Sequence, residues 1–309
     1  MTEGRYRRLP PAAWYPAHDP VATARMLTLR SGLHARVVEA GPPDGAPVLL
    51  VHGWACSAYS FRHQLPALAA AGFRASAVDL KGHGLSDRPV APGEYAPEAM
   101  ERFALDVVDA LGAGRMALVG HSLGGGIATQ VTLRAPERVA RRAAVSAVGF
   151  GTVPFLPAAT HLPSMLVERP IQTFAPRWLW HLVLHGVAGR LRPYSPRDID
   201  EYWAPTQFPE FPLVLWRLVR SFGWTPLLPD ERERLRMPLL VIYGGRDRVV
   251  RRGGDEPMAA AAEAAATADA GAQVRIIADA GHAAQEEAPD VVNRLLLDFL
   301  APWAARPAG

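Results

Sequence analysis

The sequence is poor in cysteine and lysine, and both shortages limit what the protein can be. Its single cysteine, Cys56, has no partner for a disulfide within the chain, so burial and hydrogen bonding must hold the fold together. Its single lysine, Lys81, leaves arginine to supply nearly all the basic charge, and the arginines are scattered along a chain whose net charge is +3. Nucleic-acid binding needs basic side chains gathered on one face. We therefore expect no nucleic-acid partner.

Long hydrophobic runs and targeting signals are also missing. No segment reaches the ~18 uncharged apolar residues that a membrane-spanning helix needs. The first 20 residues contain neither the apolar stretch nor the small-residue cleavage site of a secretory signal. These features predict a cytoplasmic protein without stable membrane insertion, and they leave its oligomeric state open.

The chain does contain a regular alternation of two kinds of apolar segment. Hydrophobic residues make up 49% of the 309 positions, which is enough for a large core. A hairpin is expected at 26–30 and 33–40, and the later apolar runs alternate with segments of helical period. This alternation predicts an α/β fold with a mostly parallel sheet covered by helices on both faces. We expect about eight strands, the later ones at 48–53, 74–80, 116–120, 140–148, 238–245 and 273–279.

The alternation stops after position 148 and resumes near position 231. Residues 149–230 are rich in proline, tryptophan and phenylalanine, and they contain two patches of helical period near Trp178 and Trp216. We therefore predict a helical cap of residues 149–230, inserted after the sixth strand, and a core formed by residues 1–148 and 231–309.

One short segment carries the strongest chemical signal. Gly120-His121-Ser122-Leu123-Gly124 follows an expected strand and precedes an expected helix. A sharp turn between a strand and a helix strains its central residue and leaves no room for side chains two positions before and after it. The turn lifts the serine hydroxyl out of the sheet and places it at a helix N-terminus, which stabilises developing negative charge. Ser122 is therefore the expected nucleophile.

A serine hydroxyl needs a base, and the base needs an acid that orients it. His282 and Asp247 each come directly after an expected strand, so both should lie at the carboxyl edge of the sheet. The order Ser122, Asp247, His282 is also the order in which the partners of such a turn occur. Asp230 and Asp255 remain alternatives for the acid, because geometry and not spacing decides between them.

Two backbone amides are expected to bind the oxyanion of the reaction. The residue after the nucleophile, Leu123, supplies one, and the loop after an earlier strand supplies the other. That loop is His52-Gly53-Trp54, and we assign the second amide to Trp54. Substrate pockets are mostly apolar. Candidates for the pocket wall are Trp54, Phe150, Trp203, Trp216 and Val249.

These segments resemble the α/β-hydrolase fold family of serine hydrolases. The resemblance rests on VHGW, DLKGHGLSDRP, GHSLGG, GGRD and AGHAAQEEAP, which stand in the family's order over about residues 26–303, apart from the insertion. HGW is similar to the esterase and cofactor-free haloperoxidase branch, in which proline often stands at the position of Ala55. The resemblance implies a triad of Ser122, Asp247 and His282, with no metal and no organic cofactor.

The expected reaction is hydrolysis of a small carboxylic ester with a hydrophobic group, through an acyl-enzyme on Ser122. The same groups would serve a lactonase, a C–C bond hydrolase, a perhydrolase or haloperoxidase, or an acyltransferase. Haloalkane dehalogenases and epoxide hydrolases of the resembled family carry an aspartate at the turn, so Ser122 argues against both. A ligand-binding member of the fold without catalysis is a further alternative, which the complete set of Ser, Asp and His disfavours.

The other histidines are interpreted as structural. His52, His83 and His121 are expected to order loops rather than to act as bases. His181 and His185 stand four positions apart, as two metal ligands on a helix do. HLVLH lacks the glutamate of an H-E-x-x-H motif and an obvious third ligand, so no metal site is expected.

Three further residues near the motifs receive a structural interpretation as well. Cys56 is expected to be a small buried apolar residue rather than a nucleophile. Glu286 and Glu287 follow the expected base closely and are interpreted as polar residues that lead into the last helix.

Overall fold

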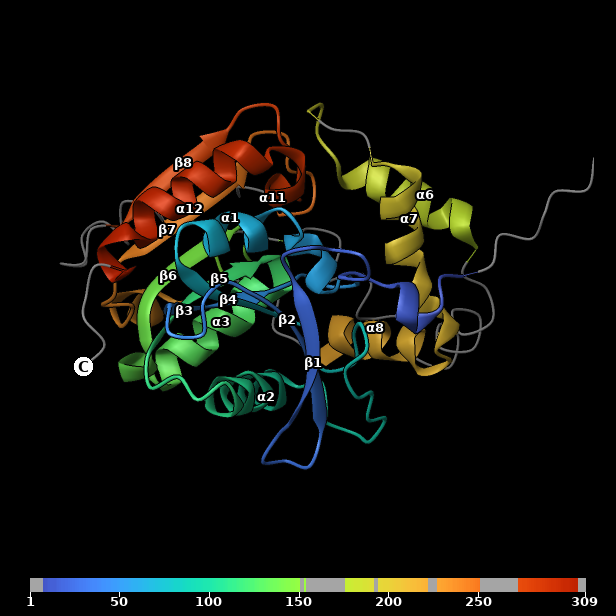
Figure 1. Cartoon of the computed structure of the whole chain (residues 1–309), viewed down its shortest axis with the longest axis horizontal. Coiled ribbons are helices and arrows are strands. Elements are labelled where there is room, and N and C mark those ends of the chain that lie inside the picture. Colours follow the sequence, from blue (N-terminus) through green and yellow to red (C-terminus); the bar gives the residue numbers. More distant parts are fainter. Residues whose placement is uncertain are drawn as a thin grey trace, which may run out of the picture.

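An eight-stranded sheet organises the described part of the protein (Figure 1). The computed structural model describes residues 8–150, 153, 176–191, 194–221, 227–250 and 272–304. The strand order is β1-β2-β4-β3-β5-β6-β7-β8. The first two strands form the expected antiparallel hairpin, β2 pairs antiparallel with β4, and every later pairing is parallel. The mostly parallel α/β sheet predicted from the sequence is confirmed. Its strands are β1 (Thr23–Thr28), β2 (His34–Ala40), β3 (Ala46–Val51), β4 (Phe73–Val78), β5 (Met116–His121), β6 (Val139–Val145), β7 (Leu239–Gly244) and β8 (Gln273–Ile277).

Helices cover both faces of this sheet, and the strands show why. In β3, Leu49 and Val51 belong to one buried cluster while Val48 and Leu50 belong to another. Alternate residues of a strand point to opposite faces, so a strand that is apolar at every position is covered on both sides. The first cluster includes residues of α2 (Pro97–Ala110) and α3 (Ser122–Arg134), and the second includes residues of α1 (Gln64–Ala70) and α12 (Pro289–Ala304).

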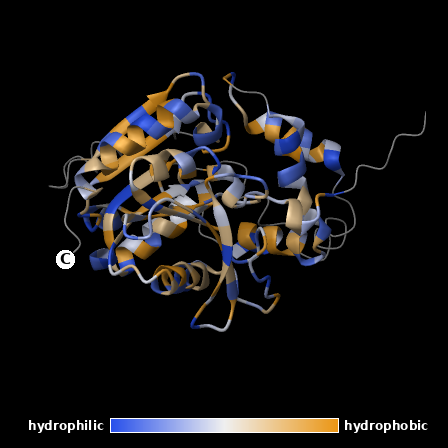
Figure 2. Cartoon of the chain, viewed as in Figure 1, coloured by the Kyte–Doolittle hydropathy of each residue, from blue (hydrophilic) through white to orange (hydrophobic). Residues whose placement is uncertain are grey.

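Among the described residues, four α-helices lie between β6 and β7, in the segment where the insertion was expected. They are α6 (Arg177–Val187), α7 (Pro196–Trp203), α8 (Glu210–Ser221) and α9 (Pro229–Glu233). Figure 1 shows α6, α7 and α8 gathered at one side of the molecule, with β7, β8 and α12 at the other side. Figure 2 shows α8 to be largely hydrophobic, whereas α6 and α7 mix polar and hydrophobic positions. The expected helix at 256–270 lies outside the described residues.

Residues 8–22 form an N-terminal arm before β1, and this arm contacts α7 of the insertion. The arm has a short 3-10 turn (Pro11–Ala13), and Trp14 after it is buried. The Tyr15 amide donates to the Glu201 carboxylate on α7 at 2.9 Å. Within the described ranges, no helix is long and apolar enough to cross a membrane.

Candidate active site

Ser122 lies at a sharp turn from strand to helix, as its flanking glycines predict. β5 ends at His121 and α3 begins at Ser122 itself, with no intervening loop residue. Ser122 has a φ of 50°, in the left-handed region that costs energy for a residue with a side chain. A Cβ on Gly120 would lie 2.5 Å from the Gly124 carbonyl oxygen, and a Cβ on Gly124 would lie 2.2 Å from the carbonyl oxygen of Val51. Both glycines are therefore required by the close approach of backbone to backbone.

Ser122, His282 and Asp247 form one continuous row of hydrogen bonds. The Ser122 Oγ lies 2.9 Å from His282 Nε2, and His282 Nδ1 lies 2.9 Å from Asp247 Oδ2. The histidine and the aspartate follow β8 and β7, so the parallel sheet brings residues 160 and 35 positions apart to one edge. All three side chains are nearly buried.

The environment of Asp247 keeps its carboxylate ionised. Its Oδ1 accepts the amides of Val249 and Val250 at 2.8 and 3.0 Å. Burial alone raises the pKa of Asp247, but the charge and hydrogen bond of His282 and the two amides outweigh it, and the pKa is lowered overall. An ionised acceptor at Oδ2 keeps the proton of the neutral imidazole on Nδ1, which leaves Nε2 free to accept the serine proton. Among the alternative acids, Asp230 is exposed on α9, and Asp255 lies outside the described residues.

A second histidine supports the backbone of the first. His121 Nε2 donates to the His282 carbonyl oxygen at 3.1 Å. Burial lowers the pKa of His121 to about 3, so the ring is neutral at physiological pH. This contact orders the loop of His282, which is the structural role expected for His121.

The loop after β3 lies close to Ser122, because a Cβ on Gly53 would lie 3.1 Å from the Ser122 Cβ. Trp54 follows that strand, and Leu123 is the second residue of α3, where an amide has no acceptor within its own helix. His52 Nε2 accepts the Leu80 amide at 2.9 Å. His83 Nε2 accepts the Ala55 amide at 3.2 Å, and Ala55 has a φ of 60°. Burial lowers the pKa of both histidines, so they are neutral acceptors that hold this loop in place.

Helix α8 covers the same loop from the insertion side. The Trp54 indole, which is 38% exposed, donates to the Leu215 carbonyl oxygen at 3.0 Å. Ala55 packs in one buried cluster with Phe211 and Leu215. The insertion therefore touches the loop that follows β3.

The remaining pocket candidates lie in different parts of the described structure. Phe150 and Trp216 are buried in one core cluster, and Val249 packs against it. Trp203 lies at the end of α7, with the Arg8 guanidinium 5.0 Å from the centre of its ring. Whether these residues line a substrate pocket stays a prediction.

The interpretation of the two glutamates after the histidine was incomplete. Glu286 and Glu287 belong to a short helix, α11 (Ala284–Glu287), which precedes α12, but they are only 2% and 4% exposed. Both side chains bond to the insertion or to residues that hold it. No sequence pattern distinguished them from exposed glutamates, because their partners come from segments ~100 and ~220 positions away.

Neither the paired histidines of α6 nor Cys56 adds a reactive group to the row. His181 and His185 are exposed and stack on each other with ring centres 4.0 Å apart. In the described part of the chain, no three His, Cys, Asp or Glu side chains gather as metal ligands would. Cys56 is half-buried rather than buried, and its thiol lies 3.4 Å from the Trp54 carbonyl oxygen.

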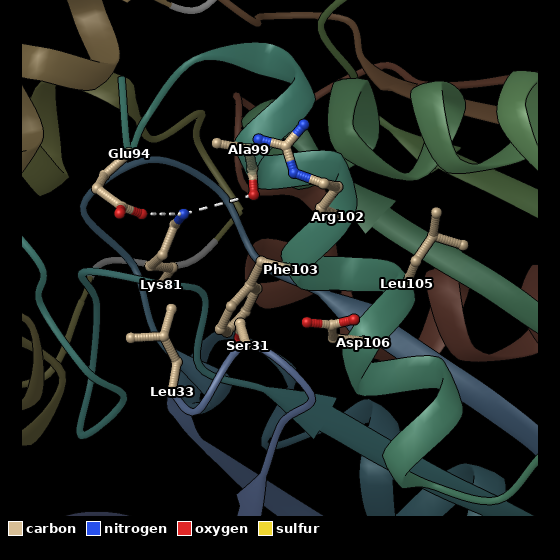
Figure 3. Close-up of a pocket in the computed structure, with 9 residues that line it drawn as sticks. All are labelled: Ser31, Leu33, Lys81, Glu94, Ala99, Arg102, Phe103, Leu105 and Asp106. Atoms are coloured by element: carbon tan, nitrogen blue, oxygen red, sulfur yellow. Dashed lines mark hydrogen bonds and ion pairs between the residues drawn. The ribbon is translucent and has the colours of Figure 1, made fainter. Parts of the chain in front are cut away.

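A cavity of about 430 Å³ lies apart from the serine (Figure 3). The side chain of Lys81 in its wall is 3% exposed and donates to Glu94 at 2.8 Å. None of Ser122, Asp247 and His282 lines this cavity. Its lining residues are Ser31, Leu33, Lys81, Glu94, Ala99, Arg102, Phe103, Leu105 and Asp106.

The sequence matches the family model of the alpha/beta hydrolase fold over residues 46–289. The chain belongs to the α/β-hydrolase fold family. The match spans both sides of the insertion and includes all three residues of the hydrogen-bonded row.

Known α/β-hydrolases and other proteins similar to this chain carry several different names. Epoxide hydrolase A of Mycobacterium tuberculosis is 39% identical over 143 residues, which are 46% of this chain and 42% of that protein. The chain therefore spans less than half the length of this relative. The magnesium-chelatase 30 kDa subunit of Rhodobacter capsulatus is 29% identical, with 92% of this chain and 97% of that protein covered. The solved carboxylesterase CesB of Bacillus subtilis is 22% identical with a TM-score of 0.73, covering 94% of this chain and 95% of that one, which shows a shared fold.

Proposed function

We propose that this α/β-hydrolase is a serine hydrolase that cleaves a small carboxylic ester with a hydrophobic group, through an acyl-enzyme on Ser122. The observation that supports the proposal is the row in which 2.9 Å separates Ser122 Oγ from His282 Nε2 and 2.9 Å separates His282 Nδ1 from Asp247 Oδ2. A nucleophile, a base and an orienting acid in hydrogen-bond contact are what acyl transfer by serine requires.

The mechanism follows from the protonation states. His282 takes the hydroxyl proton as Ser122 Oγ attacks the ester carbonyl, and ionised Asp247 stabilises the imidazolium that forms. The imidazolium then protonates the leaving alcohol, and the acyl group stays on the serine. His282 next removes a proton from water, which attacks the acyl carbon and releases the acid. This chemistry requires no metal and no organic cofactor.

Two amides are proposed to stabilise the tetrahedral intermediate. The Leu123 amide lies at the N-terminus of α3, where the helix dipole favours negative charge. The Trp54 amide comes from the loop that His83 and α8 hold in place. Each such donor contributes ~3–4 kcal/mol to the rate in other enzymes that use an oxyanion hole.

The likeness to epoxide hydrolase A suggests a different reaction, which the side chain at the turn disfavours. Opening an epoxide by covalent catalysis requires a nucleophile whose adduct water can cleave. A carboxylate forms an ester with the epoxide carbon, and water can attack that ester at its acyl carbon. Ser122 would form an ether, which has no acyl carbon to attack. We therefore favour acyl chemistry.

We also propose that the segment between β6 and β7 forms a cap that selects the substrate. The contact of α8 with Trp54 supports this, because it places apolar helix residues beside the proposed oxyanion loop. Trp54, Phe150, Trp203, Trp216 and Val249 are proposed to form the pocket wall. A lactone, an activated C–C bond, an acyl acceptor other than water or a peroxide would use the same triad.

The deciding experiment compares Ser122→Ala with the wild-type protein. Labelling by a fluorophosphonate should disappear, and hydrolysis of p-nitrophenyl esters should fall by about 10⁴-fold or more. Ser60→Ala is the control, because Ser60 is a buried serine whose Oγ has no hydrogen-bond partner among the described residues. If wild-type protein is labelled no faster than denatured protein, the chain is a binding member of the fold. If Ser122→Ala keeps near-wild-type turnover, the proposed mechanism is wrong.

A further inference from the structure

The helix directly after His282 is tied to the insertion by two buried carboxylates. α11 begins two residues after the histidine and contains Glu286 and Glu287. Buried carboxylates are costly unless they are paired or hydrogen-bonded. Each of the two accepts a hydrogen bond from a different part of the insertion.

Glu286 belongs to a buried cluster of charged and polar side chains that binds α7 to α11. Arg62 bridges Glu286 and Asp198 of α7, with N–O distances of 2.5 and 2.7 Å. The Tyr202 hydroxyl, also on α7, donates to Glu286 at 2.5 Å. Burial raises the pKa of Glu286, and the charge of Arg62 and the hydrogen bonds of Tyr202 and Arg62 oppose that rise. α7 is thus held to the element that follows the base.

Glu287 joins the insertion to the loop of the base itself. Its Oε2 accepts the Gly281 amide at 2.9 Å and the Gly189 amide at 2.5 Å. Gly281 immediately precedes His282, and Gly189 lies in the connector between α6 and α7. In addition, the His282 amide donates to the Val187 carbonyl oxygen at 3.0 Å. The backbone of the base is therefore bonded directly to the insertion.

The two backbones approach each other too closely for side chains. A Cβ on Gly189 would lie 2.3 Å from the Asp279 carbonyl oxygen and 2.4 Å from the Gly281 amide nitrogen. A Cβ on Gly281 would lie 2.3 Å from the Gly189 amide nitrogen. Ordinary carbon–oxygen contacts are ~3.3 Å or longer, so any side chain here moves the connector and the loop apart by about 1 Å.

We propose that Glu287 is a positioning residue. It holds the connector between α6 and α7 against the loop that carries His282. The base therefore lies beside Ser122 only when the insertion is packed against this loop. This rests on the proposed serine hydrolase function. A displacement of about 1 Å at a reacting group can cost ~10²-fold in rate. The insertion thus acts on the chemical step as well as on the choice of substrate.

The first test is a matched pair of glycine substitutions in the insertion. Gly189→Ala introduces the clash, whereas Gly186→Ala, three positions earlier on α6, meets nothing within 4 Å. We expect Gly189→Ala to lower kcat on short and long p-nitrophenyl esters by a similar factor of ~10–100, with KM nearly unchanged. Fluorophosphonate labelling of Ser122 should slow by a comparable factor. Gly186→Ala should match the wild-type protein in all three measurements.

The second test separates the two hydrogen bonds accepted by Glu287 from the general packing of its side chain. Glu287→Gln keeps an oxygen that can accept both amides, and its NH₂ group replaces Oε1, which has no hydrogen-bond partner among the described residues. Glu287→Ala removes the acceptor. We expect Glu287→Ala to lower kcat by ~10-fold or more and Glu287→Gln to stay within a few-fold of wild type. Thermal unfolding is measured for every variant, and rates are compared below its onset.

Hydrogen exchange supplies a readout that does not need activity. In Gly189→Ala and Glu287→Ala, the peptide containing Gly281 and His282 should exchange its amides faster than in Gly186→Ala. The inference is overturned if Gly189→Ala changes only KM or chain-length preference, if the two glycine variants behave alike, or if Glu287→Gln loses as much activity as Glu287→Ala. If the proposed function is wrong instead, Ser122→Ala keeps its activity. The faster amide exchange in Gly189→Ala and Glu287→Ala is still observed in that case.

Discussion

Replacing Asp247 with asparagine should disable the base without changing the shape of the site. The asparagine oxygen can accept the Val249 and Val250 amides, which bond to Oδ1 in the wild-type protein. The NH₂ group then faces His282 Nδ1 across the 2.9 Å contact. Nδ1 must now accept, so the ring proton moves to Nε2, and Nε2 can no longer accept the serine proton.

The size of the loss follows from two terms. Opposite charges ~4 Å apart at an effective dielectric constant of ~20 attract by ~4 kcal/mol, which the variant loses when the imidazolium forms. Holding the ring in the less favourable tautomer adds ~1 kcal/mol, the scale of a net hydrogen bond. A total of about 5 kcal/mol corresponds to a ~10⁴-fold fall in kcat, as in other triads that lose this carboxylate.

The assay is steady-state hydrolysis of a p-nitrophenyl ester, with thermal unfolding as the check on folding. Asp279→Asn is the control, because Asp279 lies three residues before His282 but is 52% exposed and pairs with Arg246 on the surface. Asp230→Asn tests the alternative acid. A loss of less than 10-fold in Asp247→Asn, or a large loss in Asp230→Asn, would refute this reasoning.

Three further outcomes are expected. Trp216→Ala should change the ratio of kcat/KM between long and short acyl esters by ~10–150-fold, and leave labelling by a small organophosphate nearly unchanged. Gly124→Ala should lower the free energy of unfolding in urea by about 1–3 kcal/mol, because its Cβ meets the carbonyl oxygen of Val51, whereas Gly114→Ala meets nothing and should be close to neutral. Burial raises the pKa of Asp198, but the Arg62 charge and the hydrogen bonds of Ser195 and Tyr59 lower it more, so its pKa in the folded protein is below the usual value. Its contribution is present above the unfolded value of ~3.9 and is lost as pH falls through the folded value, so Asp198→Asn should flatten the acid side of a plot of unfolding free energy against pH.

Local patterns in the sequence determined the order and type of most elements. Runs such as Val48–Val51 are apolar at consecutive positions, which is typical of a strand covered on both faces. The glycines around Ser122 likewise predicted a strained turn. A side chain at either glycine would collide with the neighbouring backbone, so only glycine allows the close approach. Such features depend on residues within a few positions of one another, so the sequence carries them without reference to the rest of the molecule.

Contacts between distant segments were decided by the tertiary structure alone. The sequence left three aspartates as the partner of His282, and the sheet places Asp247 beside the ring because β7 and β8 are neighbours. It made Glu287 look like an ordinary polar residue, although the carboxylate lies buried between Gly189 and Gly281. The physical reason is that burial and hydrogen bonding depend on which elements pack together. The local sequence pattern around a residue does not indicate which distant segment will pack over it.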